Sequence, residues 1–196
     1  MAYHIAVDSC TDMTAAMKKD EHITLVPLTL NVGEDKFIDD ETFNQAEFLR
    51  HVAECPEAPS SACPSPDAYM QAYGYDNEDA YAVTLSAELS GSYNSAKLGA
   101  DLLKEEYPDK KIHVFNSRSA SAGQTLILMK LVEQIGKTVI HPTEKYLMIS
   151  HCNCLKRAEW LKVEIEKKYA FKGIVIVDTA GVATMYANDG GIVVAY

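Results

Sequence analysis

The chain has 196 residues, of which 47% are hydrophobic and 23% are charged, and its formal net charge is −10. This length allows one large domain or two small ones, and the composition is that of an ordinary globular protein. Because binding to phosphate polymers and to anionic lipid depends on cationic residues, the charge disfavours nucleic acid and membrane surfaces as partners. No stretch is long and apolar enough to cross a bilayer, so we expect no stable membrane insertion.

The N-terminal residues and the cysteines indicate in which cellular compartment we expect the protein. Residues 1–7 enter a strand-like pattern directly, without a charged and apolar leader. The five cysteines are an odd number and are scattered, which favours reduced thiols over a disulfide framework. We therefore expect a cytoplasmic protein.

Predicted strands and helices follow one another along the chain. A proline lies inside the second strand, which places that strand at a sheet edge or gives it a bulge. A hairpin turn is expected at residues 31–36, and Ser65 is expected to cap the third helix from a proline-rich loop. The predicted strands are residues 3–7, 23–30, 37–38, 81–85, 111–115, 145–150, 173–178 and 192–196, and the predicted helices are residues 14–19, 44–53, 66 onward, 94–107, 124–135 and 156–169.

This alternation predicts an α/β fold. Right-handed crossovers between the strands up to residue 136 imply a mostly parallel sheet with helices on both faces. We assign residues 1–136 to this domain. A second series begins near residue 145 and predicts a smaller α/β unit at residues 137–196, which has little room for a core of its own. We expect it to pack against the first domain.

A polar turn joins the predicted strand at residues 81–85 to the predicted helix at residues 94–107. It contains Ser90, Gly91 and Ser92. The first amides of a helix are unpaired and carry partial positive charge, so such a turn suits a carboxylate or a phosphate. Simple capping of the helix by Ser90 explains the same residues equally well.

Small hydroxyl residues follow several predicted strands. At the carboxyl ends of parallel strands they would lie in the usual ligand crevice of an α/β sheet. No nucleophile elbow, Walker loop or dinucleotide fingerprint occurs in the sequence, so a hydrolase is not indicated. These hydroxyl-rich junctions are residues 8–11, 60–65, 86–92 and 116–121.

Three potential zinc ligands lie close together at His151, Cys152 and Cys154. A zinc site normally needs a second ligand pair, and none is evident elsewhere in the sequence. We therefore favour a strand-to-helix loop with local hydrogen bonds, and we predict no metal site there.

Five segments carry a family resemblance: AVDSCTD (residues 6–12), VPL (26–28), SACPSP (61–66), LSGSYNSA (89–96) and NSRS (116–119). In this order they resemble the successive motifs of the DegV family, over most of residues 3–130. Residues 148–191 also resemble the end of the family's second domain. The resemblance implies a bacterial, cytoplasmic protein of two α/β domains that binds a long-chain fatty acid. It further implies that the carboxylate is presented to the kinase subunit of a fatty acid kinase, which forms an acyl phosphate for phospholipid synthesis.

The resemblance also implies binding residues. Ser61 stands where the family has a threonine that bonds the fatty acid carboxylate, and Ser90 stands at the partner serine. The amides of Gly91 and Ser92 would complete the shell around a group that only accepts hydrogen bonds. Asp8, Ser9 and Ser117 are expected to support the site. Ala62 and Cys63 replace the family's usual serine and glutamine. No catalytic residue and no cofactor other than the bound acid are implied.

The main departure from the family lies between Lys130 and Lys145. Family members have several tens of additional residues there, including a glycine-glycine-arginine segment. Either this chain has lost that portion or the sequence omits it. The family's closing histidine in the C-terminal segment is not evident either. Loss of the segment would open the apolar tunnel that covers the acyl chain, which weakens binding because each buried methylene contributes only about 0.8 kcal/mol.

Two other functions remain open at the level of sequence. One is an enzyme for phosphotransfer or hydrolysis that holds a phosphate at the same helix start and a metal ion on Asp8 and Asp12, or on Asp39 and Asp40. The other is an interaction module that binds no small ligand.

Overall fold

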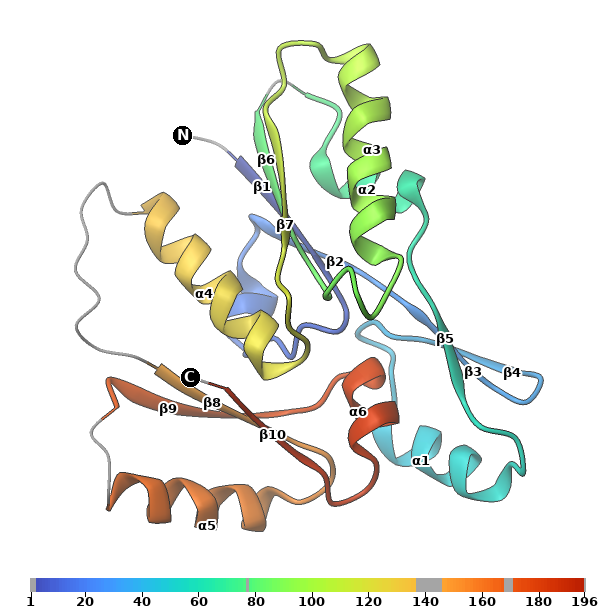
Figure 1. Cartoon of the computed structure of the whole chain (residues 1–196), viewed down its shortest axis with the longest axis vertical. Helices are drawn as coiled ribbons and strands as arrows, with labels where there is room; N and C mark the ends of the chain where they lie inside the picture. The colour runs from blue at the N-terminus through green and yellow to red at the C-terminus, as the bar shows by residue number, and fades with distance from the viewer. Residues whose placement is uncertain (1–2, 77, 137–145, 168–170, 196) are drawn as a thin grey trace.

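A four-stranded parallel sheet forms the centre of the computed structural model, which describes residues 3–76, 78–136, 146–167 and 171–195. The strand order is β2-β1-β6-β7 (Figure 1). All three strand pairs are parallel, as the α/β prediction requires. The strands are β1 (Tyr3–Asp8), β2 (Ile23–Val26), β6 (Asp79–Thr84) and β7 (Ile112–Asn116).

Helices cover both faces of this sheet because successive side chains of β1 point in opposite directions. Ala6 packs in a core with α2 (Pro66–Tyr73) and α3 (Ser92–Glu106). Ile5 and Val7 pack on the other face against Leu128 of α4 (Ala122–Gly136). The predicted two-sided architecture is confirmed.

A second, antiparallel sheet is formed by β3 (Thr29–Val32), β4 (Asp35–Ile38) and β5 (Ser60–Ala62), in the order β4-β3-β5. The predicted hairpin turn joins β3 to β4, and Gly33 adopts a φ of 58° there, which glycine accommodates without strain. The helix α1 (Gln45–Glu54) covers this sheet, and Asn44 caps it by accepting a hydrogen bond from the Glu47 amide.

Three predictions for this region were wrong. Residues 23–30 form two strands in different sheets, with Pro27 between them because proline cannot donate to a ladder, although β2 does lie at an edge of the first sheet as predicted. The helix expected at residues 14–19 is only a 3-10 turn at Met17–Lys19, whose first amide donates to the Thr14 hydroxyl at 3.3 Å. Ser60 and Ser61 lie in the short strand β5 rather than in a loop.

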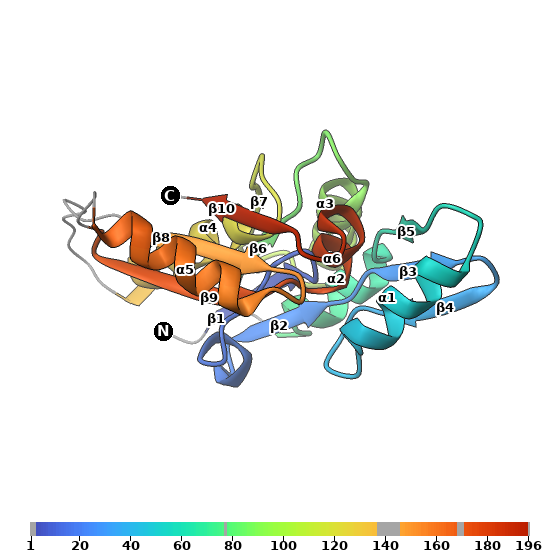
Figure 2. The same ribbon diagram turned by 90° about the horizontal axis from the view of Figure 1, so that it is seen from below.

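A third sheet contains β8 (Tyr146–His151), β9 (Gly173–Asp178) and β10 (Ile192–Ala195), in the order β10-β8-β9. The pair β8–β9 is parallel and the pair β8–β10 is antiparallel. Figures 1 and 2 show α5 (Leu155–Glu166) on one face of this sheet and α4 on the other. Since α4 also contacts β6, it is shared between the first and third sheets.

The predicted division at residue 136 borders residues 137–145, which lie outside the described residues, and it stays a prediction. The same holds for the segment predicted to be missing there. Across the described ranges, no helix has both the length and the apolar character needed to span a membrane.

Candidate functional site

The start of α3 is open to solvent. Its N-cap residue is Gly91, which has no side chain to cap the helix. Gly91 is exposed and Ser90 is half-buried. The Ser90 hydroxyl accepts a 3.2 Å hydrogen bond from the Ser92 amide, so it orders the turn from outside the helix. An open helix start of this kind is favourable for an anion.

The strand β5 runs beside this turn. The exposed Ser61 pairs with Leu30 of β3. Two residues later, the Cys63 Sγ lies 3.8 Å from the Ser95 Oγ of α3, and a Cβ on Gly91 would lie 3.1 Å from the same sulfur. The absence of a side chain at Gly91 therefore lets the segment that follows Ser61 approach the start of α3.

A buried carboxylate supports the turn from inside. The Ser92 hydroxyl donates a 2.6 Å hydrogen bond to Asp8 Oδ2 and lies 2.6 Å from the Tyr69 hydroxyl. Asp8 also accepts from the Leu85 amide at 2.7 Å and from Gln124 Nε2 at 2.8 Å. Burial raises the pKa of Asp8, and these hydrogen bonds oppose that rise. Asp8 thus ties β1 to β6, α3 and α4.

The other two residues expected to support the site are bonded within their own surroundings. The Ser9 hydroxyl accepts from the Leu28 amide at 3.0 Å and so joins the loop after β1 to the segment before β3. The Ser117 hydroxyl donates to the Ser119 carbonyl and accepts from the Ser119 amide, both at 3.1 Å. Both hydroxyls therefore shape loops at the carboxyl ends of strands.

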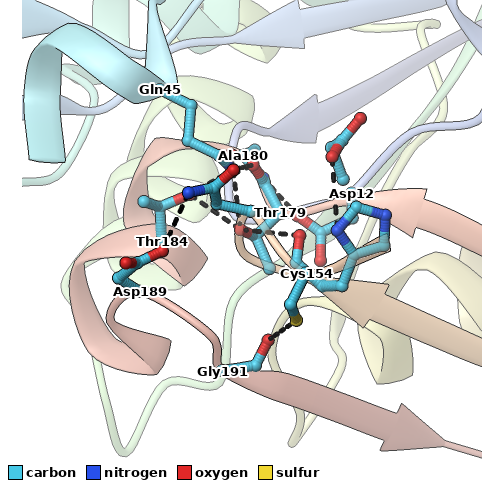
Figure 3. Close-up of polar contacts among 11 residues, drawn as sticks. Asp12, Gln45, Cys154, Thr179, Ala180, Thr184, Asp189 and Gly191 are labelled. Carbon is cyan, nitrogen blue, oxygen red and sulfur yellow. Dashed lines mark hydrogen bonds and ion pairs between the residues drawn. The ribbon is translucent and has the colours of Figure 1, made fainter. Parts of the chain in front are cut away.

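Two further aspartates hold the short helix α6 (Gly181–Ala187) against the N-terminal part of the chain. Asp12 accepts a 2.6 Å hydrogen bond from the Ala180 amide (Figure 3) and a second one from the Ser121 hydroxyl. Asp39 accepts from the Gly181 amide at 2.6 Å and from the Val182 amide at 3.0 Å. Asp39 therefore receives the first two amides of α6, although it lies in the segment that precedes α1.

The helix α1 contributes to the same junction. Gln45 Nε2 donates to the Thr179 carbonyl and hydroxyl at 3.1 Å and to the Thr184 hydroxyl at 3.2 Å (Figure 3). Val182 packs in the core beneath the second sheet with Leu30. No sequence pattern pointed to these contacts, since they join residues more than a hundred positions apart.

Burial affects the ionisation of the two carboxylates, Asp12 and Asp39, that hold α6. It raises the pKa of Asp12 to about 6, and it raises the pKa of Asp39 in the same direction. Both carboxylates receive backbone amides, which partly offset the desolvation.

In the described part of the chain, the proposed metal ligands do not form a group of three or more side chains that could share one ion. Within the described ranges, the group of His, Cys, Asp or Glu side chains close enough to share an ion is His4, Asp76 and Glu78. Lys110 donates a 2.8 Å hydrogen bond to Asp76 Oδ1, so this group is part of an ion-pair network. Cys154 donates to the Gly191 carbonyl at 3.4 Å, in keeping with a locally bonded loop.

The sequence and the fold have counterparts in one family of α/β proteins. The family described as "Uncharacterised protein, DegV family" matches residues 2–137, which is more than half of the chain. The chain belongs to the DegV family, as its motifs predicted.

Individual relatives agree with this assignment. A DegV domain-containing protein of Streptococcus pyogenes is 35% identical over 134 residues, which cover 67% of this chain and 47% of the relative. A crystal structure of a DegV family protein from Ruminococcus gnavus, described with vaccenic acid, superposes with a TM-score of 0.91 at 34% identity and covers 100% of this chain and 99% of that one.

A more distant neighbour shares the fold. The fatty acid kinase (Fak) B3 protein of Streptococcus pneumoniae, loaded with linoleic acid, has a TM-score of 0.90 at 22% identity, with 100% of this chain and 99% of that one covered. The chain spans about half the length of the curated relatives that it matches.

Proposed function

We propose that this chain binds a long-chain fatty acid and holds its carboxylate at the start of α3. The observation that carries the proposal is the helix start at the exposed Gly91, which has no side chain and lies close to the segment that follows Ser61. The vaccenic acid described with the Ruminococcus gnavus relative supports the choice of ligand.

Hydroxyl and amide donors suit a carboxylate, which only accepts hydrogen bonds. Ser61 is exposed on β5, and Ser90 accepts from the Ser92 amide. A serine hydroxyl that accepts one hydrogen bond keeps its own proton to donate. We assign that proton of Ser90, the Ser61 hydroxyl and the Gly91 amide to the carboxylate. The Ser92 amide, which now donates to the Ser90 hydroxyl, would also donate to the carboxylate once that hydroxyl turns toward the ligand.

An exposed apolar side chain in the turn supplies a surface for the acyl chain. Leu89, in the turn itself, is 69% exposed. Neither Ser61 nor Ser90 lines either of two cavities, of about 290 and 520 Å³, in the part of the chain that the structure describes. We therefore place the acyl chain along this surface, where water reaches part of it.

The chemistry that follows binding belongs to a partner. By analogy with the fatty acid kinase B3 neighbour, we propose that a kinase subunit phosphorylates the exposed carboxylate. The chain itself then acts as a binding subunit in the cytoplasm, with no cofactor other than the acid.

Lipid extraction tests the ligand. The full chain is purified from bacteria, extracted with organic solvent and analysed by mass spectrometry beside a Ser61→Ala, Ser90→Ala double variant. Ser60→Ala is the matched control, because neighbouring residues of a strand point to opposite faces. A long-chain fatty acid should accompany the wild type and Ser60→Ala and should be lost from the double variant. Lipid-free wild type, or equal lipid in all three proteins, contradicts the proposal.

A further inference from the structure

The strand β7 lies at one edge of the first sheet, and among the described strands it pairs with β6 alone. The Ala80 amide of β6 donates a 2.8 Å hydrogen bond to the Lys111 carbonyl, so the backbone of Lys111 and of every second residue after it faces β6. The amides and carbonyls of Ile112 and Val114 therefore point away from β6. Within the described ranges these groups have no backbone partner.

The helix α3 lies along this free edge (Figure 1). Ile112 and Val114 pack in the core beneath α3, so their side chains point to the face that the helix covers. Helix and strand together line a cavity of about 290 Å³. An extended segment at the free edge would therefore lie beside α3. The residues of α3 in the lining are Tyr93, Lys97, Ala100, Asp101 and Lys104.

The edge carries positive charge, although the chain as a whole has a formal net charge of −10. Lys97 and Lys104 lie about two turns apart on α3, and neither has an ion-pair partner in the described part of the chain. Lys111 is exposed where the chain enters β7. Asp101 is the acidic residue of the lining. Such a distribution attracts a segment that carries carboxylates.

The other face of β7 offers an apolar contact. His113 and Phe115 alternate with Ile112 and Val114, so their side chains point away from α3. His113 stacks on Tyr81 of β6, with ring centroids 5.8 Å apart, whereas Phe115 is 41% exposed. A strand added at this edge would place one set of its side chains beside the lysines of α3 and the other set beside Phe115.

We propose that β7 is the docking edge for an extended, acidic segment of a partner protein, which adds to the first sheet as a further strand. The backbone of that segment would pair with the free amides and carbonyls of Ile112 and Val114. Its acidic side chains would lie beside Lys97 and Lys104, and an apolar side chain would cover Phe115. In this mode of recognition the main-chain hydrogen bonds supply affinity, and the alternating side chains supply specificity.

A second copy of the chain fits this edge less well than an acidic segment does. Antiparallel pairing of β7 with its own copy would keep both α3 helices on the same face of the joint sheet. Lys97 and Lys104 of the two copies would then approach one another, and like charges placed opposite each other are destabilising. An acidic segment replaces this repulsion by attraction.

Fluorescence anisotropy tests the proposal with the full chain at physiological salt and a labelled, end-capped decapeptide in which glutamate alternates with valine. Saturable binding is expected. The Lys97→Glu, Lys104→Glu double variant should bind about ten-fold more weakly, because two attractive contacts become repulsive. The Lys36→Glu, Lys156→Glu double variant is the matched control. It makes the same charge change at exposed lysines of β4 and α5, where salt screens the peptide, and should bind as the wild type does.

Two further measurements distinguish strand addition from attraction between charges. Hydrogen exchange at the Ile112 and Val114 amides should slow when the peptide binds. One peptide is N-methylated at its valine amides and another at its glutamate amides. One of the two should fail to bind, because alternate amides of the added strand face β7. A thermal unfolding curve checks that both double variants fold.

Several results would overturn the proposal. They are absence of saturable binding by the wild type, equal binding of a decapeptide in which lysine alternates with valine, and equal losses of affinity in the two double variants. Unchanged exchange at Ile112 and Val114 would show that the peptide binds elsewhere. Dimerisation of the chain without peptide, with slow exchange at the same two amides, would assign the edge to a second copy.

Discussion

The Ser92 hydroxyl donates a 2.6 Å hydrogen bond to the buried carboxylate of Asp8, which lies 84 positions earlier in the chain. This bond fixes the first residue of α3 to the end of β1. The turn at Ser90 and Gly91 is therefore held in place relative to the central sheet. Rigid support of this kind reduces the ordering that a ligand would otherwise impose.

Asp8→Asn should reduce the free energy of unfolding by about 2 kcal/mol, because the side-chain amide would present a donor to surrounding donors. In the wild type, Asp8 accepts from Leu85, Ser92 and Gln124. Urea unfolding followed by circular dichroism measures the change. A variant as stable as the wild type would show that these hydrogen bonds contribute little.

Asp12 should make stability depend on pH. Burial raises its pKa from 3.8 to about 6, so the folded state binds more protons than the unfolded state between those values. Its contribution is therefore fully present below pH 3.8 and is lost as the pH rises through about 6. Asp8 and Asp39 act in the same direction, while Asp76, whose pKa is lowered to about 2, contributes stability that is lost only in acid.

Asp12→Asn separates this contribution from the others, since the amide can still accept from Ala180 and can donate to Ser121. Between pH 7.5 and pH 5, the wild type should gain about 1 kcal/mol relative to the variant. Urea unfolding at both pH values measures the difference. Parallel pH profiles for the two proteins contradict the assigned pKa.

Asp39→Asn should loosen α6 selectively. The carboxylate accepts from both the Gly181 and Val182 amides, and an asparagine side chain can accept from only one oxygen. We expect a loss of about 1–2 kcal/mol in stability and faster hydrogen exchange at residues 181–184. Mass spectrometry of exchanged peptides measures it, with peptides from α3 as the internal control. Uniform acceleration in both helices would indicate global rather than local destabilisation.

Affinity should depend weakly on acyl length if the chain lies on the exposed surface at Leu89. Full burial contributes about 0.8 kcal/mol for each methylene, which is about four-fold in affinity. We expect less than about two-fold for each methylene between dodecanoic and octadecanoic acid. Displacement of a fluorescent fatty acid measures the series. A four-fold step for each methylene would show that the chain is enclosed.

The sequence predicted the alternating strands and helices of the first sheet because each element has a local signal: Val7 and Ile5 alternate with Ala6, and Ser65 caps α2 as expected. The division of residues 23–30 between two sheets was not predictable in this way, because Pro27 signals an interruption without saying which sheet each half joins.

The candidate site was also predictable only where the signal is local in the sequence. Ser61, Ser90 and Gly91 follow from motifs and from the physics of a helix start. The hydrogen bond from the Gly181 amide of α6 to Asp39 joins residues that are 142 positions apart, so the pairing is evident only in the folded chain. Asp12 likewise resembled a possible metal ligand in sequence, whereas its carboxylate receives the Ala180 amide.

The most direct measurement is the affinity of the full chain for a long-chain fatty acid such as octadecenoic acid, compared among the wild type, Ser61→Ala, Ser90→Ala and Ser60→Ala. A hydrogen bond to a charged group contributes about 1.5–3 kcal/mol, so each of the first two substitutions should weaken binding at least about ten-fold. Ser60→Ala should bind as the wild type does. If Ser61→Ala and Ser90→Ala both retain wild-type affinity, the carboxylate is not held at the start of α3.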